Sequence, residues 1–118
     1  MIKTERIYNA PTGEGFRILV DRLWPRGIRK DEVKVDLWLK EIAPSKELRK
    51  WFGHDPDKWN EFRKRFFQEL DQNKELIDQI ISKARESDVI LLYGAKDEKH
   101  NNAVALNEYI EAKMKMQN

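Results

Sequence analysis

Two short apolar segments with a mostly helical stretch between them constrain the fold of this chain more than any other sequence feature. Residues 16–23 and 88–93 are rich in β-branched and large apolar side chains, which is typical of strands buried on both faces. The stretch between them predicts helices over 46–52, from residue 55 onward and around 76–84. This pattern predicts an α/β domain with a mostly parallel central sheet flanked by helices, in a Rossmann-like three-layer arrangement.

Further elements are expected near both ends and in the middle of the chain. Residues 2–8 alternate loosely and predict a first strand, and residues 33–42 predict a short helix. A last helix begins at Asn101 or Asn102. The connector 9–15 is short for a crossover between parallel strands, which leaves the first two strands open to either a parallel or an antiparallel arrangement.

Length and composition predict a single domain over residues 1–118 and exclude several classes of protein. The chain is 40% hydrophobic and 37% charged, and its net charge of +2 argues against both a polybasic tail and an acidic solvating chain. Because there is no cysteine, disulfides, thiolate metal sites and cysteine nucleophiles are excluded. The sequence shows no membrane-length apolar run and no signal-peptide stretch, so we expect a cytoplasmic protein without membrane partners.

Polar side chains gather where the two apolar strands are expected to end. Residues 21–27 follow the first strand, and residues 94–97 with the helix start at 100–102 follow the second. The carboxyl ends of parallel strands meet at one edge of a sheet, where open α/β sheets bind their ligands, so we expect both groups to line one crevice. A third polar group, over residues 45–55, can fold over the top.

These polar groups predict a pocket for a small anion such as a phosphate or a nucleotide. Arginine guanidinium groups bind phosphate through paired hydrogen bonds, tryptophan rings can stack on bases, and helix N-termini add N–H donors. A histidine and a carboxylate in the same pocket suit general acid–base catalysis. The candidate catalytic residues are Asp21, His54 and Asp97, and the candidate ligand-binding residues are Arg22, Trp24, Arg26, Ser45, Arg49, Trp51, Lys96, Asn101 and Asn102.

The same side chains have structural alternatives that the sequence leaves open. Asp21 can simply orient neighbouring cations, His54 can bond to loop backbone, and Ser45 can act only as a helix cap. Trp24 and Trp51 suit core packing as well as stacking. The sequence contains no dinucleotide-binding, P-loop or nucleophile-elbow motif and no metal-ligand spacing, so we expect neither a cofactor nor a metal.

Four segments carry a resemblance that extends over nearly the whole chain, and the first and the last of them are long and specific motifs. They are RILVDRLWPRG at 17–27, WLKEIAPS at 38–45, LRKWFGHDP at 48–56 and LYGAKDEKHNNA at 92–103. These motifs resemble the YeaO-like family of bacterial and archaeal proteins, within the group called domain of unknown function 488. The resemblance implies a compact α/β fold, a parallel first pair of strands and a stand-alone cytoplasmic protein. It implies no settled activity, but the family motifs coincide with the candidate residues above.

Three kinds of function fit these residues. An enzyme would bind a phosphate- or nucleotide-containing substrate with the arginines. Either Asp21 or Asp97 would act as the base or orienting group, and His54 would transfer the proton. A non-catalytic module would bind a nucleotide or nucleic acid, although the small net charge and the missing nucleic-acid-binding motifs disfavour nucleic acid. In a protein-interaction module the charged cluster would be structural only. The sequence specifies neither the reaction nor the oligomeric state.

Overall fold

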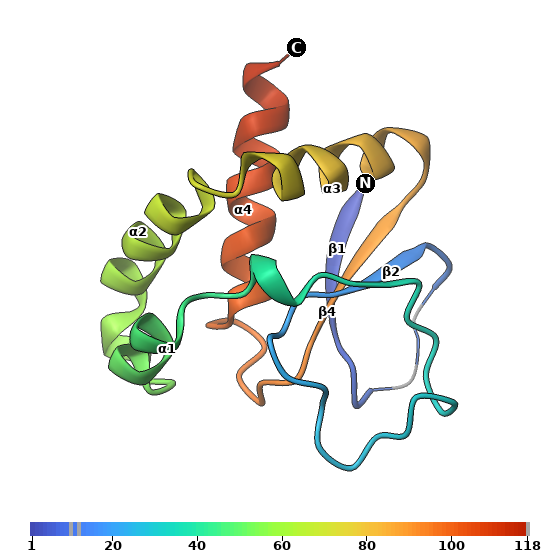
Figure 1. Cartoon of the computed structure of the whole chain (residues 1–118), viewed down its shortest axis with the longest axis horizontal. Helices are drawn as coiled ribbons and strands as arrows, with labels where there is room; N and C mark the ends of the chain where they lie inside the picture. The colour runs from blue at the N-terminus through green and yellow to red at the C-terminus, as the bar shows by residue number, and fades with distance from the viewer. Residues whose placement is uncertain (10, 12, 118) are drawn as a thin grey trace.

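The described residues of the chain form one parallel sheet of four strands with four α-helices (Figure 1). The computed structural model describes residues 1–9, 11 and 13–117. The strands are β1 (Ile2–Arg6), β2 (Phe16–Leu19), β3 (Leu37–Trp38) and β4 (Val89–Tyr93), in the sheet order β1-β4-β2-β3. Every neighbouring pair is parallel, which confirms the predicted α/β class and its mostly parallel sheet.

The last strand, β4, occupies the centre of the sheet. All of its residues, from Val89 to Tyr93, are buried, because neighbouring strands flank it and apolar layers cover both of its faces. β4 pairs with β1 on one side and with β2 on the other. The first two strands are therefore parallel, as the family resemblance implies, but they are not neighbours.

Each α-helix of the described chain begins or packs as its sequence predicts. The helices are α1 (Lys46–Phe52), α2 (Trp59–Leu70), α3 (Lys74–Glu86) and α4 (Asn102–Met116). The Ser45 side chain caps α1 by accepting a hydrogen bond from the Leu48 N–H, and Asn101 caps α4 by accepting one from the Val104 N–H. Asp55 caps a short 3₁₀ turn, Pro56–Lys58, that leads into α2.

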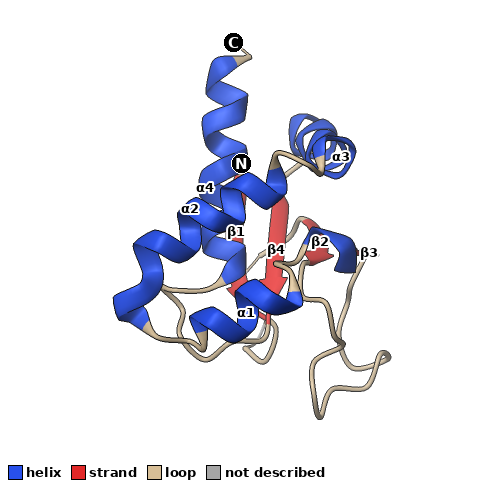
Figure 2. Ribbon diagram, turned by 60° about the vertical axis from the view of Figure 1, so that its left-hand side comes forward, coloured by secondary structure: helices blue, strands red, loops and turns tan. Residues whose placement is uncertain are grey.

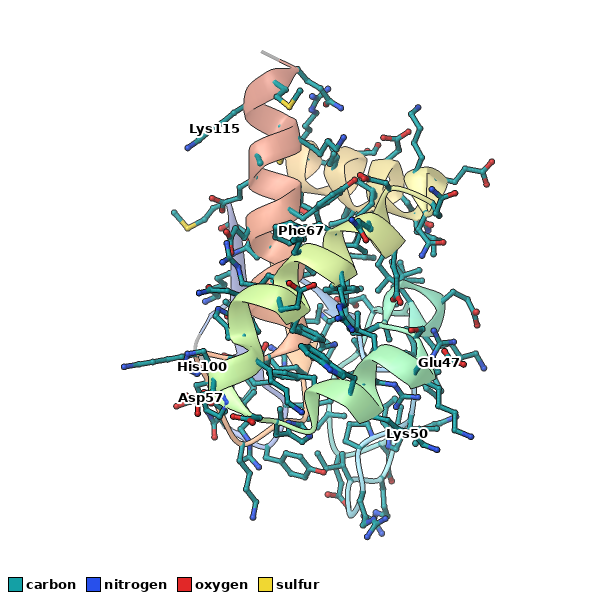
Figure 3. The ribbon with its side chains drawn as sticks, turned by 90° about the vertical axis from the view of Figure 1, so that its left-hand side faces the viewer. Glu47, Lys50, Asp57, Phe67, His100 and Lys115 are labelled. Carbon is teal, nitrogen blue, oxygen red and sulfur yellow. The ribbon has the colours of Figure 1, made fainter. Side chains whose placement is uncertain are left out.

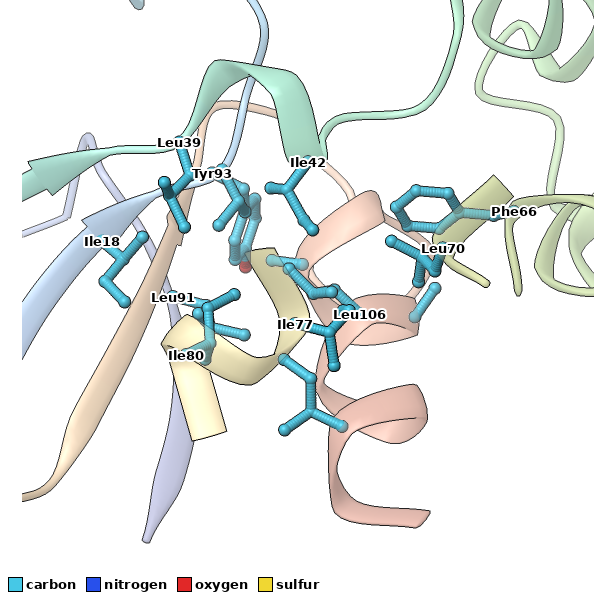
Figure 4. Close-up of a cluster of buried hydrophobic side chains, with 14 of the residues drawn as sticks. Ile18, Leu39, Ile42, Phe66, Leu70, Ile77, Ile80, Leu91, Tyr93 and Leu106 are labelled. Carbon is cyan, nitrogen blue, oxygen red and sulfur yellow. The ribbon is translucent and has the colours of Figure 1, made fainter. Parts of the chain in front are cut away.

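All four of these helices bury their apolar sides against the same face of the sheet. Phe66 and Leu70 from α2, Ile80 from α3 and Leu106 from α4 join Leu91 of β4 in one core (Figure 4). Viewed from the side, α4 and α3 stand to the left and right of the strands, and the end of α4 projects beyond the sheet (Figure 2). This face holds most of the buried apolar surface and supplies most of the stability.

The opposite face of the sheet is covered by the segment 20–36 and β3 rather than by helices. Trp24, Ile28 and Val33 from this segment, together with Trp38 of β3, pack on the buried side chains of Ile90 and other strand residues. The third layer of the fold is therefore a long loop. A loop has no repeating amphipathic pattern, so nothing in the sequence indicates that residues 20–36 cover this face of the sheet.

The predicted helix over residues 33–42 is wrong. Val33 and Val35 alternate with Lys34 and Asp36, and both valines pack on the face of the sheet opposite the helices, so the chain leads into β3 without forming a helix. Leu37 pairs with Ile18 and only a short 3₁₀ turn, Lys40–Ile42, follows. The predicted strand 16–23 is also shorter, since β2 ends at Leu19 and the next residues turn away from the sheet.

None of the helices in the described ranges is both long enough and apolar enough to cross a membrane.

Candidate functional site

A cavity of about 380 Å³ lies where β2 and β4 end, and we call it the strand-end cavity. Its position follows from the parallel sheet, which brings the carboxyl ends of both strands to one edge. The segment before α1 and the ends of α1 and α4 close its sides. The cavity is lined by Asp21, Arg22, Leu23, Ala43, Pro44, Arg49, Phe52, His54, Phe62, Gly94, Ala95, Asn101 and Asn102.

The Asp21 carboxylate joins the three segments that meet at the cavity. Its Oδ2 accepts a hydrogen bond of 2.8 Å from the Gly94 N–H, and its Oδ1 accepts one of 3.1 Å from Asn102 Nδ2. Burial raises the pKa of Asp21 above its ordinary value, and this effect outweighs the hydrogen bonds and the positive charges of Arg49 and His54, which favour the ionised form. Asp21 is thus a partly desolvated carboxylate held in a fixed position.

Gly94 leaves no room for a side chain at this junction. A Cβ atom placed on Gly94 would lie 3.1 Å from Asp21 Oδ2 and 3.7 Å from the ring of Tyr8. Glycine therefore allows the backbone after β4 to approach the carboxylate closely enough to donate its hydrogen bond.

Arg22 enters the cavity wall with much of its hydrogen-bonding capacity unused. Its Nη2 donates to the Ala43 carbonyl oxygen at 3.2 Å, and its Nη1 lies 3.6 Å from the carboxylate of the exposed Glu41. Its Nε is buried and has no hydrogen-bond partner among the residues that the structure describes. A buried donor without a partner is unfavourable, and because Nε is closed off from solvent, the donors that a ligand in the cavity can reach are those of the Nη groups.

Arg49 and His54 come from the end of α1. Gly53 and His54 both have left-handed backbone conformations, with φ of 55° and 57°, which ends the helix. The left-handed region is strained for a residue with a side chain, typically by about 1 kcal/mol or more. The turn places His54 beside Phe52, whose ring stacks on Phe62 with centroids 4.2 Å apart and forms an apolar wall of the cavity.

The comparisons with known proteins agree with the motifs in the sequence. The family described as "Inactive DUF488-N3 subclade" matches residues 1–118. The chain belongs to this family. The uncharacterized protein YeaO of Escherichia coli is 39% identical over 112 residues, which are 94% of this chain and 97% of YeaO. The resemblance to YeaO-like proteins is thereby confirmed.

Mycobacterial members of the group are similar over a shorter stretch. The uncharacterized protein Rv3073c of Mycobacterium tuberculosis and the uncharacterized protein Mb3100c of Mycobacterium bovis are each 44% identical over 78 residues. Those residues are 65% of this chain and 66% of each relative. No solved structure matches the chain.

Six of the residues predicted for the site line the cavity of this DUF488 protein. Asp21 and Arg22 come from the end of β2, and Arg49 with His54 from the end of α1. The other two are Asn101 and Asn102 at the start of α4. Asn101 is almost completely buried, and its side chain donates a hydrogen bond to the Asp97 carbonyl oxygen. The Asn102 side chain donates one to the Asp21 carboxylate.

Three predicted residues serve other parts of the structure. Trp24 packs edge-on against Trp38 beneath the sheet, and its Nε1 donates to the Ile28 carbonyl oxygen at 2.6 Å. Ser45 caps α1, and its Oγ donates to the carboxylate of Glu69 at 2.5 Å. Trp51 lies in a separate groove between α1 and α2. For Trp24 and Ser45, the structural alternative is the one that the structure supports.

The other three predicted residues lie outside the cavity lining. Arg26 and Lys96 are exposed. Asp97 accepts hydrogen bonds from the backbone N–H groups of Lys99 and His100, and its Oδ2 lies 2.9 Å from His100 Nδ1. These backbone bonds, with a contribution from His100, lower the pKa of Asp97 below its ordinary value. Asp97 therefore stabilises the turn before α4 instead of facing Asp21 across the cavity.

Sequence reasoning missed the apolar wall of the cavity. Phe62 follows the core spacing of an amphipathic helix, so nothing in the pattern separates it from an ordinary core residue. Ala43 and Pro44 carry no polar group to attract attention. In the described part of the chain, no cluster of three or more histidine, aspartate or glutamate side chains is arranged to hold a metal ion.

Proposed function

We propose that this protein binds a small anionic ligand in the strand-end cavity, and that it acts as a binding protein rather than as an enzyme. The observation that carries the proposal is the state of Arg22. Its guanidinium stands at the cavity wall, where its two Nη groups form one long hydrogen bond and one long ion pair and keep further donors for a ligand. A phosphate or carboxylate oxygen is the acceptor that suits such a group best.

Arg49 adds a second positive charge to the same cavity. Among the residues that the structure describes, its guanidinium forms no ion pair within 4.0 Å, although it interacts electrostatically with Asp21. His54 lies on the left-handed turn after α1 and lines the same cavity. Two guanidinium groups and a histidine around one concave site favour a ligand with a concentrated negative charge.

Two observations favour binding without turnover. The family to which the chain belongs is described as an inactive subclade. In addition, both oxygens of the Asp21 carboxylate already accept hydrogen bonds, and Asp97, the other candidate base, is engaged in a turn outside the cavity. The cavity is therefore lined by one of the two carboxylates that the sequence predicts as catalytic groups.

The enzymatic alternative has one observation in its favour. Burial raises the pKa of Asp21, and His54 lines the same cavity, so the two can form an acid–base pair. If the protein is an enzyme, phosphorus NMR will show the bound phosphate compound being converted during incubation. We expect the spectrum to remain that of the added compound.

The partner that we propose is a small molecule and not a nucleic acid. The two arginines converge on one cavity, whereas a nucleic-acid surface extends basic groups along a backbone. A cytoplasmic location belongs to the same proposal.

The proposal is tested by calorimetric titration with phosphorylated metabolites. Wild-type protein, Arg22→Ala and Arg49→Ala are compared with Lys50→Ala as a matched control. Lys50 is a neighbouring cation of α1 that is exposed and does not line the cavity (Figure 3). We expect each arginine variant to bind about tenfold or more weakly, because each loses a charge-assisted hydrogen bond. Lys50→Ala should bind as the wild type does. If no phosphorylated compound binds, or if all four proteins bind equally, the proposal is wrong.

A further inference from the structure

The strand-end cavity carries both signs of charge, and this restricts the ligands that it can accept. The carboxylate of Asp21 lines the same space as the guanidinium groups of Arg22 and Arg49. An anion drawn to the arginines therefore comes under the field of a carboxylate in a partly desolvated site, where like charges repel more strongly than in water. Inorganic phosphate can offer that carboxylate only the P–OH of its own protonated form, which belongs to the same small group that the arginines attract.

Asp21 retains the capacity to accept further hydrogen bonds. An ionised carboxylate has about four acceptor positions, and the described residues fill one on each oxygen, through Gly94 and Asn102. A ligand hydroxyl that donates to a remaining position forms a charge-assisted hydrogen bond and removes the repulsion at that point. Because Gly94 and Asn102 hold the carboxylate in place, little side-chain entropy is lost when such a ligand binds.

The size and walls of the cavity call for a carbon skeleton between the two kinds of polar group. A volume of about 380 Å³ is larger than a phosphate ion needs and lies within the range of small-molecule pockets. Ala43, Pro44 and Phe52 supply apolar surface next to the arginines. The ligand must therefore present an anion, hydroxyl donors and some apolar surface within one compact molecule.

We infer that the ligand is a phosphorylated sugar, either free or as the sugar–phosphate part of a mononucleotide. Its phosphate binds at Arg22 and Arg49, and its hydroxyl groups donate to Asp21. This inference rests on the proposed function, since it names the class of anion that the same cavity binds.

The ligands themselves test this inference without any change to the protein. Ribose 5-phosphate and n-pentyl phosphate carry the same phosphate on five carbons, but only the first has hydroxyl groups. Calorimetric titration of the wild-type protein should show ribose 5-phosphate binding about tenfold or more tightly than n-pentyl phosphate and inorganic phosphate. Adenosine 5′-monophosphate distinguishes the two candidate ligands. If it binds more tightly than ribose 5-phosphate, the ligand is a mononucleotide; if it binds equally or more weakly, the ligand is a free sugar phosphate.

The variant Asp21→Asn makes the test sharper because its expected effects have opposite signs. Asparagine keeps the shape and an oxygen that can accept the Gly94 N–H, but it removes the negative charge and the acceptor of the Asn102 hydrogen bond. Ribose 5-phosphate should therefore bind several-fold more weakly to the variant, and n-pentyl phosphate, which has no hydroxyl group, should bind more tightly at a pH where its phosphate is doubly ionised.

The possible failures of the two proposals can be told apart. If n-pentyl phosphate and ribose 5-phosphate bind equally and both depend on Arg22 and Arg49, the cavity binds anions but the sugar assignment is wrong. If none of the four compounds binds to the wild-type protein, the proposed function fails and the sugar assignment fails with it.

Discussion

The carboxylate of Asp21 and the backbone N–H of Gly94 are joined by a hydrogen bond of 2.8 Å between residues that are 73 positions apart in the chain. This bond ties the end of β2 to the end of β4, the two central strands of the sheet. Asn102 adds a second tie, since its Nδ2 donates to both the Val20 carbonyl oxygen and Asp21. The floor of the strand-end cavity is therefore fixed by the junction of two strands and a helix start.

Replacing Gly94 with alanine should destabilise the fold. The new Cβ would lie 3.1 Å from Asp21 Oδ2, and relieving that contact requires the carboxylate or the backbone to move. Overpacking of this kind costs about 1–3 kcal/mol, measured as the free energy of unfolding in urea. Gly13→Ala is the matched control, because its Cβ would meet only the flexible end of the Lys3 side chain. Equal stability of Gly94→Ala and wild type would show that the junction is not tightly packed.

Arg17 should be the most sensitive charged position in the protein. Its guanidinium pairs with Glu5 at 3.0 Å, and both side chains are almost completely buried beneath the loop-covered face, at 6% and 5% exposure. Arg17→Leu would remove this cation from the buried Glu5 carboxylate, and breaking a buried ion pair typically costs about 3–5 kcal/mol. Arg29→Ala, which removes exposed ion pairs with Asp31 and Glu32, should change the free energy of unfolding by less than about 1 kcal/mol. A loss of similar size in both variants would contradict the structure.

Asp97 should support the fold at neutral pH and lose this effect in acid. Its pKa is lowered by hydrogen bonds from the N–H groups of Lys99 and His100 and from the His100 side chain, so the ionised form is bound best in the folded state. This contribution is complete above the ordinary aspartate pKa and disappears as the pH falls through the lower, folded-state pKa. Asp97→Asn should therefore lower the melting temperature at neutral pH and have less effect in acid. A loss that is independent of pH would contradict this.

Asp21 should show the opposite pH dependence. Its pKa is raised mainly by burial, so ionisation of Asp21 costs stability as the pH rises through the folded-state pKa. The stability of the wild type relative to Asp21→Asn should therefore decrease from acidic to neutral pH. Carboxyl-carbon NMR gives the direct measurement: the pKa of Asp21 should lie above the ordinary value for aspartate, and the pKa of Asp97 should lie below it. The reverse order would show that the surroundings of the two carboxylates are misassigned.

Trp51 should be dispensable for ligand binding, although its sequence position predicts a stacking role. The guanidinium of Arg65 lies 4.3 Å from the centroid of its ring, and the ammonium group of Lys58 lies 5.1 Å from it, in the groove between α1 and α2. Trp51→Ala should leave the affinity for ribose 5-phosphate within about twofold of the wild type, because the side chain does not line the cavity. A tenfold loss without a loss of stability would place the ligand in the groove instead.

The strands and helices could be predicted where a local pattern specifies them. The apolar run of β4 and the caps at Ser45 and Asn101 are readable because each depends on neighbouring residues. The helix predicted over 33–42 is wrong because Val33 and Val35 follow a period of two, which is typical of extended chain and not of a helix. The order of strands, in which β4 enters between β1 and β2, depends on long-range pairing that no local pattern encodes.

The candidate site was predictable only in its strand-end and helix-start residues. Asp21 and Asn102 follow from the rule that parallel strands end at one edge, and the structure joins them by a hydrogen bond. Asp97 also follows a strand, but local backbone bonds take its carboxylate away from the cavity. Whether a polar residue faces a ligand or its own backbone is decided by distances of a few ångströms, which residue type alone does not convey.

The most direct measurement for the central claim is a backbone amide NMR titration of the wild-type protein with ribose 5-phosphate. The account predicts saturable shifts that centre on the N–H groups of Gly94, Ala95 and Asn102 and on the end of α1 around His54, and that require about tenfold or more ligand in Arg49→Ala. Shifts that centre on the groove around Trp51, or no shifts at high ligand concentration, would contradict the claim that the strand-end cavity binds a small anion.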